Sequence, residues 1–482
     1  MSRGCVVGID IGTTGTKGVA IDPTTGSVAT TAQAEYPVRS PHPGWMEQDP
    51  DDWVAAAQTV LHRIRSEGVE ILGLGLSGQM HGLVCLDAAD RVIRPAILWN
   101  DGRSARECSA IEAKLGRERL VQLSGNRALP GFTAPKLLWM RHHEPALYAR
   151  IRRVALPKDY VRDALVGGHV SDVAEASGTL LLDVATRRWS AELLDEFEIP
   201  RSWLPDLAEG TDRVGSLDGV PVAAGGGDQA AAAVGAGILG SGPLSIALGT
   251  SGVVLAALDR FVAEEQGRVH AFCHAVPERW VVMGVMLAAA GALAWYHDTL
   301  LPDSGYDQMV EEARSCPPGC EGLVFLPYLS GERTPHADPD ARGAFVGLSL
   351  EHGRGSLTRA VLEGVAFGLA DCLDSVRGVG VEAGRARASG GGARSRLWLQ
   401  IIASVLELPV EVMGSEQGSA FGAALLGGVA AGVYANIVEA VTACVHVADV
   451  IDPVADWIGP YREVRRRFRS LYPALGSITE PS

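Results

Sequence analysis

The chain has 482 residues, of which 47% are hydrophobic and 21% are charged, and its formal net charge is −15. Single cores rarely grow beyond roughly 250–300 residues, so this length predicts at least two domains. The composition is that of a soluble globular protein, and the acidic balance argues against nucleic acid or an anionic membrane as a partner.

The eight cysteines show no zinc-binding pattern, since Cys316 and Cys320 have no nearby Cys or His pair to complete four ligands. Free thiols are expected. The uncharged stretch 229–258 is interrupted by glycines and Pro243, which favours buried elements over a membrane span. No secretory pattern opens the sequence, and we therefore expect a cytoplasmic protein.

The opening stretch, residues 8–22, reads as two buried strands joined by a turn of glycines and threonines. Gly12 and Gly15 are expected to supply the positive φ of a tight turn. Backbone N–H groups and the hydroxyls of Thr13 and Thr14 can converge on an anion there. Asp10 at the strand end is placed to hold a hydrated Mg²⁺ against phosphates, although a plain Gly/Thr hairpin would look the same.

The second half repeats this arrangement. Residues 244–248 lead into Gly-Thr-Ser-Gly, with Thr250 in the turn, and residues 253–257 lead out. No carboxylate precedes this second turn, so the two hairpins are not chemically equivalent. A repeat in corresponding positions favours two hairpins that clamp a polyphosphate from both sides over a coincidence of short turns.

Two further loops place polar groups at strand ends. Residues 71–76 form a predicted strand that runs into Ser-Gly-Gln-Met-His-Gly, which contains Met80 and His81. The strand at 96–98 ends in Trp99, an asparagine and Asp101. Taken alone, a histidine in such a loop is more often structural than ligand-binding.

A helix is predicted to begin at Pro50 with Asp49 as its cap.

Gly-Gly-Gly followed by Asp228 and Gln229 precedes an alanine-rich helix. A helix cap is the simple role for Asp228, but three glycines that open the backbone to another molecule favour a functional one. A third glycine joint at residues 387–394 contains Gly391 and Gly392 and can admit a flat nucleoside, although a strand-to-helix turn would look similar.

These segments together resemble one family, the FGGY carbohydrate kinases. The matching blocks follow the family's order and cover essentially the whole chain, and the Met-His and Trp-Asn-Asp blocks are the most specific. They are Asp-Ile-Gly-Thr-Thr-Gly-Thr-Lys, Ser-Gly-Gln-Met-His-Gly, Ala-Ile-Leu-Trp-Asn-Asp-Gly-Arg, Pro-Gly-Phe-Thr-Ala-Pro-Lys-Leu-Leu-Trp, Leu-Pro-Lys-Asp-Tyr, Gly-Gly-Gly-Asp, Leu-Gly-Thr-Ser-Gly, Leu-Ser-Gly-Glu-Arg-Thr-Pro-His and Gly-Gly-Gly-Ala-Arg-Ser.

The resemblance implies an α/β fold with two actin-like, ribonuclease H-like domains, each a mixed β-sheet flanked by helices. The expected N-terminal domain is 1–242, with the sugar site, the first phosphate hairpin and the catalytic aspartate. The expected C-terminal domain is 243–482, with the second hairpin and the adenosine site. The active site is expected in the cleft between the domains.

The resemblance also implies transfer of the ATP γ-phosphoryl group to O5 of an open-chain ketopentose, with D-xylulose as the expected acceptor. Asp228 matches the family's proton acceptor, and Met80 and His81 match its sugar-binding pair. Gln229 occupies a sugar-contact position that is often asparagine in similar enzymes, which leaves fine stereochemical selectivity open.

The remaining expected roles divide between the two substrates. Thr13, Thr14 and Thr250 are expected on phosphate oxygens, Gly391 and Gly392 against adenosine, and Asp10 on Mg²⁺. Trp99 and Asp101 are candidates for the lining of the sugar pocket, without direct contact being favoured for either.

The sequence is also compatible with two other functions. One is a different sugar or polyol kinase of the family, acting for example on D-ribulose or glycerol. The other is an actin-like ATPase that uses the nucleotide clamp to drive assembly. The family analogy also raises a homodimer as one assembly.

Overall fold

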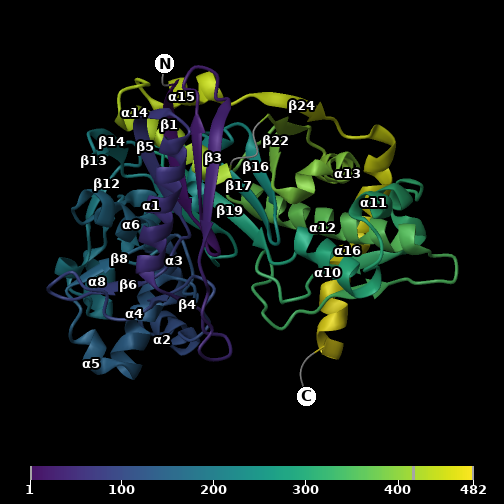
Figure 1. The fold of residues 1–482 in the computed structure, drawn as a ribbon. Coiled ribbons are helices and arrows are strands. Elements are labelled where there is room, and N and C mark those ends of the chain that lie inside the picture. Colours follow the sequence, from purple (N-terminus) through teal and green to yellow (C-terminus); the bar gives the residue numbers. More distant parts are fainter. Residues whose placement is uncertain (1–2, 415–417, 480–482) are drawn as a thin grey trace.

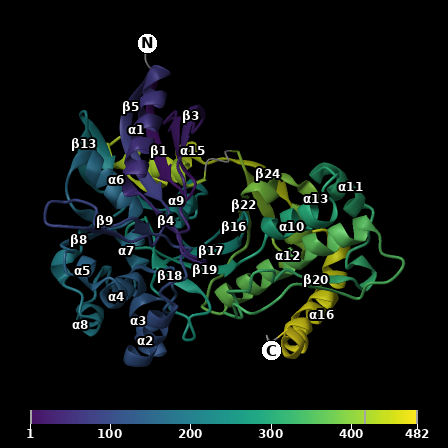
Figure 2. The same ribbon diagram turned by 60° about the horizontal axis from the view of Figure 1, so that its bottom comes forward.

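The computed structural model describes residues 3–414 and 418–479. Figure 1 shows two lobes side by side, with the N-terminal strands in one and helices α10 to α13 in the other. Figure 2 gives the same division from a second direction. Each lobe is built on a seven-stranded sheet.

The first sheet carries the opening hairpin at its centre. β1 runs parallel to β5 and antiparallel to β2, and β14 is parallel to β5. In sheet order the strands are β13 (Arg213–Leu217), β14 (Val220–Ala223), β5 (Val69–Gly78), β1 (Arg3–Ile11), β2 (Gly15–Ile21) and β3 (Val28–Glu35), and β15 (Gly226–Gly227) also pairs with β5.

The second sheet repeats the order and the directions of the first. β16 is antiparallel to β17 and parallel to β22, and β22 is parallel to β23. In sheet order the strands are β18 (His270–Cys273), β19 (Trp280–Met286), β17 (Gly252–Leu258), β16 (Leu244–Leu248), β22 (Ala386–Ser389), β23 (Val410–Met413) and β24 (Val447–Ile451). The order β3-β2-β1-β5-β14 thus matches β19-β17-β16-β22-β23, which confirms the predicted repeat and the mixed α/β, actin-like fold.

Helices cover both faces of the first sheet because alternate side chains of a strand point to opposite faces. Val7 packs with α1 (Pro50–Ser66), and its neighbour Val6 packs with α14 (Gly418–Ala430) on the other face. α1 begins as predicted, since the Asp49 side chain accepts a hydrogen bond from the backbone of Asp51. α6 (Pro157–Val166) contacts α1, and α9 (Asp228–Gly235) contacts α14.

The chain returns to the first lobe late in the sequence. α14 and α15 (Ile437–Cys444) pack with residues of the first sheet, after which β24 joins the second sheet. Figure 1 shows these late helices beside the N-terminal strands. A division by sequence at residues 242 and 243 therefore does not account for these two helices.

Glycines allow α14 to approach the sheet closely. A Cβ at Gly8 would lie 1.8 Å from the Ala420 carbonyl oxygen, and one at Gly75 would lie 1.9 Å from that of Ala423. On the other side of α14, a Cβ at Gly422 would lie 1.8 Å from the Ala231 carbonyl of α9. Backbone therefore packs on backbone across β1, β5, α14 and α9.

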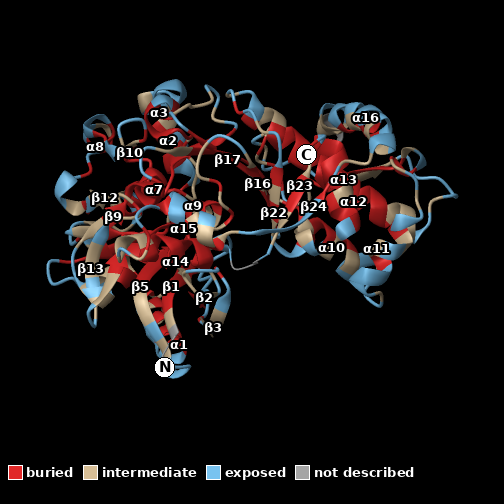
Figure 3. Cartoon of the chain, turned by 90° about the horizontal axis from the view of Figure 1, so that it is seen from above, coloured by how far each residue is buried: buried red, intermediate tan, exposed pale blue. Residues whose placement is uncertain are grey.

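The second sheet buries one face under its own helices and the other against the first lobe. Val254 belongs to the core that includes α12 (Arg354–Arg377) and α13 (Arg396–Leu406), whereas its neighbour Leu255 packs in a cluster with Phe132 and Leu137 of the first lobe. Figure 3 shows α12, α13 and α14 as largely buried helices. The lobes therefore share an apolar contact.

The remaining elements surround the two sheets. The other helices are α2 (Ala105–Leu115), α3 (Arg117–Ser124), α4 (Thr133–His143), α5 (Pro145–Tyr148), α7 (Val173–Ser177), α8 (Ala191–Phe197), α10 (Ala290–Leu300), α11 (Tyr306–Arg314) and α16 (Ala455–Thr479). The small paired strands are β4 (Glu47–Gln48) with β7 (Ala96–Ile97), β6 (Val84–Leu86) with β8 (Arg153–Ala155), β9 (Val170–Asp172) with β12 (Asp206–Ala208), β10 (Leu182–Asp183) with β11 (Arg188–Trp189), and β20 (Val324–Leu326) with β21 (Ala344–Val346). Within the described ranges, no helix combines the length and apolarity needed to cross a membrane.

Candidate active site

Asp10 lies near the C-terminal end of β1, one residue before the strand ends at Ile11. Its Oδ1 accepts a hydrogen bond of 2.8 Å from the Ser77 hydroxyl on the neighbouring β5. Burial raises the pKa of Asp10, and hydrogen bonds from Ser77 and Ser419 together with the charge of Lys17 partly oppose that rise. Ser419 belongs to the first turn of α14, so the close packing of that helix brings a second hydroxyl to the carboxylate.

The opening hairpin uses its glycines differently from the prediction. Neither Gly12 nor Gly15 has a positive φ, so the expectation of a left-handed turn is wrong. Instead, Gly12 N–H donates to the Gly15 carbonyl at 3.0 Å, and a Cβ at Gly15 would lie 2.8 Å from the Ala34 carbonyl oxygen on β3. Glycine is required there by the close approach of a strand.

Trp99 lies against the tip of this hairpin. Its indole Nε1–H donates to the Thr13 hydroxyl at 3.0 Å, while 43% of the residue stays exposed. The neighbouring Thr14 is exposed at the turn. The structure therefore places Trp99 against the opening hairpin, where the residue stays partly exposed.

Asp228 is the first residue of α9, and Gly227 occupies the cap position. Its carboxylate accepts hydrogen bonds from the backbone and the side-chain amide of Gln229. Burial and the nearby charge of Asp10 raise the pKa of Asp228 to about 7. A carboxyl group with that pKa can receive a proton near neutral pH, and the Gln229 amide orients it.

Met80 brings the predicted sugar loop into contact with the Asp228 loop. Met80 is buried, and a Cβ at Gly227 would lie 2.7 Å from its Cγ. Any side chain at position 227 would therefore displace the methionine. The two segments that sequence analysis selected independently, residues 77–82 and 225–228, meet at this point.

His81 has a fixed ring and a defined tautomer. Its Nδ1 lies 2.8 Å from the Gly178 carbonyl oxygen, which can only accept, so Nδ1 carries the hydrogen. The ring packs edge-on against Phe132 with centroids 4.7 Å apart. Burial, and then the charge of Lys136, lower the pKa of His81 to about 3. The imidazole is neutral, and Nε2 is left as an acceptor.

Asp101 supports the wall of the site. It is only 2% exposed, and its Oδ2 accepts from the Met46 backbone N–H at 2.6 Å. Arg103 binds both carboxylate oxygens, at 2.8 Å and 2.7 Å, and its guanidinium lies over the Trp45 ring at 3.7 Å. These contacts occupy Asp101, so a supporting role fits it better than direct contact with a ligand.

A cavity of about 710 Å³ in the second lobe contains the other predicted nucleotide residues. Thr250, Gly391 and Gly392 line it together with residues of α10 and α11. A Cβ at Gly391 would meet open space, whereas one at Gly392 would lie 3.0 Å from the Trp398 ring. Gly391 therefore faces the cavity, and Gly392 is required for packing on the tryptophan.

Glu175 is a buried carboxyl group that sequence analysis missed. Neither of its oxygens has a hydrogen-bond partner among the described residues. A Cβ at Gly227 would lie 2.7 Å from Glu175 Oε2. Burial raises the pKa of Glu175 well above its usual value, and the charges of Asp159, Asp172 and Asp228 add to this effect. A buried carboxyl group with a raised pKa therefore lies directly behind the Asp228 loop.

Three other polar groups of the site were also missed. Ser77 and Lys136 both lie inside sequence motifs that resemble the family. The signal for Lys136 was a lone charge among the apolar residues of a helix. Ser419 had no comparable signal, because nothing local in the sequence indicates that α14 returns to the first lobe.

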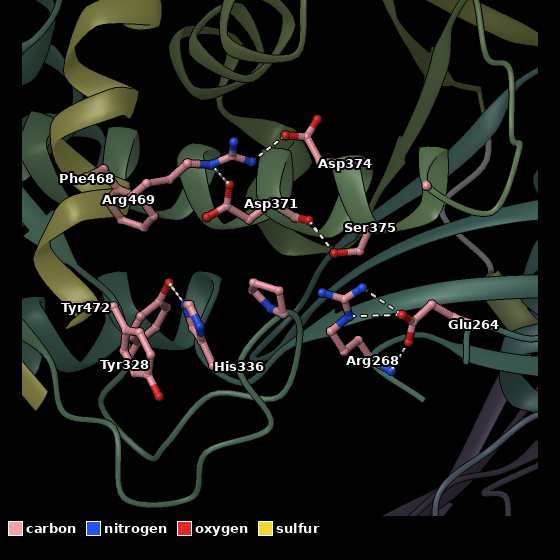
Figure 4. Close-up of a pocket in the computed structure, with 12 residues that line it drawn as sticks. Glu264, Arg268, Tyr328, His336, Asp371, Asp374, Ser375, Phe468, Arg469 and Tyr472 are labelled. Atoms are coloured by element: carbon pink, nitrogen blue, oxygen red, sulfur yellow. Dashed lines mark hydrogen bonds and ion pairs between the residues drawn. The ribbon is translucent and has the colours of Figure 1, made fainter. Parts of the chain in front are cut away.

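A second cavity, of about 440 Å³, lies between α12, α16 and the loop after β20. Figure 4 shows Arg469 bonded to Asp371 and Asp374, and Arg268 bonded to Glu264. Both arginines that line this cavity are therefore neutralised by carboxylates of the same lining. None of the predicted site residues belongs to it.

The residues present suit a hydrated metal ion better than an enclosed one. Among the residues that the model describes, no cluster of three or more His, Cys, Asp or Glu side chains could enclose a metal. Mg²⁺ keeps several waters and is commonly held by one or two carboxylates and substrate phosphates. Asp10, beside a phosphate-type hairpin, fits that mode of binding.

The two halves of the chain match the two domain models of one protein family. Residues 5–235 match the N-terminal domain of the FGGY family of carbohydrate kinases, and residues 244–431 match its C-terminal domain. The xylulose kinase of Escherichia coli K12 is 41% identical over 97% of this chain and 99% of its own length.

Solved structures extend the likeness to three dimensions. A xyloylose kinase from Brucella ovis superposes with a TM-score of 0.92 at 42% identity, covering 98% of this chain and 100% of the other. A gluconate kinase from Lactobacillus acidophilus gives a TM-score of 0.94 at 25% identity, covering 99% of both chains. With both domain models matched in order around the site described above, the chain belongs to the FGGY family of carbohydrate kinases and is an ATP-dependent sugar kinase.

Proposed function

We propose that the protein transfers the γ-phosphoryl group of ATP to O5 of D-xylulose, giving D-xylulose 5-phosphate. The observation that carries this proposal is the contact of Met80 with Gly227, which brings the predicted sugar loop to the carboxylate next in sequence. Relatives named xylulose kinase, such as that of Escherichia coli at 41% identity, support the choice of acceptor.

Asp228 is the proposed general base. Phosphoryl transfer needs the acceptor hydroxyl aligned with the γ-phosphorus and a group that receives its proton. Gln229 holds the Asp228 carboxylate at the start of α9. In the proposed reaction the hydroxyl first donates a hydrogen bond to Asp228 and then gives up its proton as the oxygen–phosphorus bond forms.

His81 is the proposed acceptor for a second sugar hydroxyl. Its Nδ1–H is held by Gly178, so only Nε2 remains to bind the sugar. A neutral imidazole accepts from a hydroxyl without needing a counter-charge, and Met80 supplies an apolar surface beside it. Trp99 is proposed to cover the sugar from the side of the first hairpin.

The nucleotide is proposed to extend from the cavity of the second lobe toward Asp10. Gly391 and Gly392 would border the adenosine, and Thr250, Thr13 and Thr14 would bind phosphate oxygens from the two hairpins. Mg²⁺, held near Asp10 through water, would neutralise the phosphate charge that develops during transfer. We place the reaction in the cytoplasm, where ATP is available and where the free cysteines would stay reduced.

The acceptor is tested by ADP release with D-xylulose, D-ribulose, L-ribulose, L-xylulose, glycerol and gluconate at matched concentrations. We expect the highest kcat/KM with D-xylulose. Gluconate belongs in the panel because a structural relative carries the name gluconate kinase. A clear preference for any other acceptor would overturn the named substrate. ADP release that needs no acceptor would favour the alternative function of an actin-like ATPase.

A further inference from the structure

We propose that Lys136 is a positioning residue for sugar binding: its buried ammonium group fixes the backbone of His81 so that the imidazole faces the acceptor. The inference rests on the proposed function, in which His81 binds a sugar hydroxyl. It concerns a residue of α4 that has no contact with the reacting atoms.

The contacts of Lys136 converge on the sugar loop. Its side chain is fully buried, and Nζ donates to the His81 carbonyl at 2.9 Å and to the Gly131 carbonyl at 2.6 Å. The Thr133 hydroxyl, one turn earlier on α4, donates to the same His81 carbonyl at 3.1 Å. One helix therefore supplies two donors to a single backbone oxygen of the proposed sugar-binding residue.

His81 needs this support because its backbone is strained. Its φ is 69°, in the left-handed region that side chains other than glycine rarely adopt. Such conformations persist where the surroundings over-determine them. The surroundings here are the Gly178 carbonyl on Nδ1, the Phe132 ring against the imidazole, and the two donors of α4 on the carbonyl.

Packing alone would not call for a lysine at this position. Leu137, Leu138 and Met140 follow Lys136 along the same buried helix, and an apolar side chain would avoid the cost of burying a charge. Burial lowers the pKa of Lys136 to about 7, and Asp101 is the main charge that opposes this shift. The Asp101 carboxylate is itself bound by Arg103. The direct hydrogen-bond partners of the Lys136 ammonium group are therefore the backbone carbonyls of His81 and Gly131.

The decisive variant is Lys136→Met, which keeps an unbranched side chain that is one atom shorter and removes the donor. We expect the dissociation constant for D-xylulose, measured by calorimetry without nucleotide, to rise at least 10-fold. The KM for ATP and kcat at saturating sugar are expected to stay within about 3-fold of the wild type, because neither Asp228 nor the nucleotide cavity contacts Lys136.

Two matched variants separate positioning from general destabilisation. Arg359→Met removes another fully buried cation, which pairs with Glu363 and Tyr461 in the second lobe. We expect it to lower the melting temperature without changing sugar binding. Thr133→Val removes the second donor to the His81 carbonyl and should weaken sugar binding several-fold, whereas Thr133→Ser keeps the hydroxyl and should bind sugar normally.

Unchanged sugar binding in folded Lys136→Met would overturn the inference. Equal loss of sugar binding in Lys136→Met and Arg359→Met would also overturn it, because the effect would then follow stability alone. If Lys136→Met does not fold, the Thr133 pair decides: equal sugar binding by the Val and Ser variants contradicts the inference.

The proposed function can fail separately. If the wild type prefers another acceptor in the panel, D-xylulose is wrong, and the same variants are then measured with the preferred acceptor. Wild-type binding of none of the six acceptors would overturn both proposals.

Discussion

At the scale of single residues, the site depends on two carboxyl groups, Asp10 and Asp228, whose pKa values are raised. Asp228 has a raised pKa because burial and the charge of Asp10 disfavour its ionised form. The raised pKa suits Asp228 as a proton acceptor. It also means that the ionised carboxylate lowers the free energy of unfolding at neutral pH. Function and stability are therefore expected to respond in opposite directions when its charge is removed.

The Asp228→Asn variant should lose most of its turnover. A positioned general base typically contributes ~10²–10⁴-fold to the rate, so kcat is expected to fall by at least about 100-fold. The affinity for ATP should remain near that of the wild type because the cavity proposed for the nucleotide lies in the other lobe. Near-normal kcat would refute the assignment of Asp228 as base.

The same variant should be more stable than the wild type above pH 7. In metal-free and nucleotide-free protein, the pKa of Asp228 is about 7, against an ordinary value of 3.8. Between those values the folded state binds more protons at this group than the unfolded chain. Its contribution to the free energy of unfolding therefore falls as pH rises to about 7 and is level above that.

Thermal unfolding at pH 5 and pH 8 measures this effect. The melting temperature of Asp228→Asn should exceed that of the wild type by a few degrees at pH 8, and by less at pH 5. Equal melting temperatures at both pH values would mean that Asp228 is solvated in the folded protein.

At the scale of elements, α14 is the piece on which the site geometry depends. It packs by backbone contact on β1, β5 and α9, and thereby holds Ser419 at Asp10 and steadies the helix that begins with Asp228. Side-chain packing could not bring these elements so close. The glycines along this contact are therefore structural requirements of the site.

Gly75→Ala tests this packing. The new Cβ would lie 1.9 Å from the Ala423 carbonyl oxygen, and backbone cannot move aside as a side chain can. We expect a loss of at least about 3 kcal/mol in the free energy of unfolding, measured by chemical denaturation. Gly384→Ala is the control, since its Cβ would meet nothing within 4 Å. A loss below about 0.5 kcal/mol for Gly75→Ala would contradict the described packing.

The sequence was most informative where chemistry and local pattern coincide. The two hairpins were visible because strand, glycine and threonine recur together, and the loop of Asp228 was visible because three glycines precede it. The reason for Gly15 was not visible, because the atom that excludes a side chain there belongs to β3, outside the hairpin.

Long-range partners set the limit of such prediction. Of the two carbonyls that Lys136 binds, that of His81 lies 55 residues earlier in the chain, so no local spacing connects the lysine with the sugar loop. The return of α14 to the first lobe likewise follows from complementary glycine surfaces that meet only in the folded protein. For the same reason, domain limits drawn along the sequence leave α14 and α15 out of the lobe in which they pack.

At the scale of the whole molecule, the proposed reaction requires the lobes to work together. The candidate base and sugar loop belong to the first lobe, whereas the cavity proposed for the nucleotide belongs to the second. The γ-phosphoryl group must therefore be presented across the boundary between them. Exclusion of water during this step is the expected reason for closure, because water would otherwise compete with the sugar.

Small-angle X-ray scattering tests closure directly. The radius of gyration should fall when D-xylulose and a non-hydrolysable ATP analogue are added together, and the change should exceed that produced by either ligand alone. No compaction with both ligands at saturating concentration would count strongly against a closing motion.

The central claim is transfer of phosphate from ATP to O5 of D-xylulose, and ³¹P nuclear magnetic resonance of the reaction with Mg-ATP tests it most directly. We predict that each ADP formed is matched by one sugar phosphate whose phosphorus couples to the two protons on C5. Inorganic phosphate in place of a sugar phosphate, or phosphate coupled to protons of another carbon, would contradict the account.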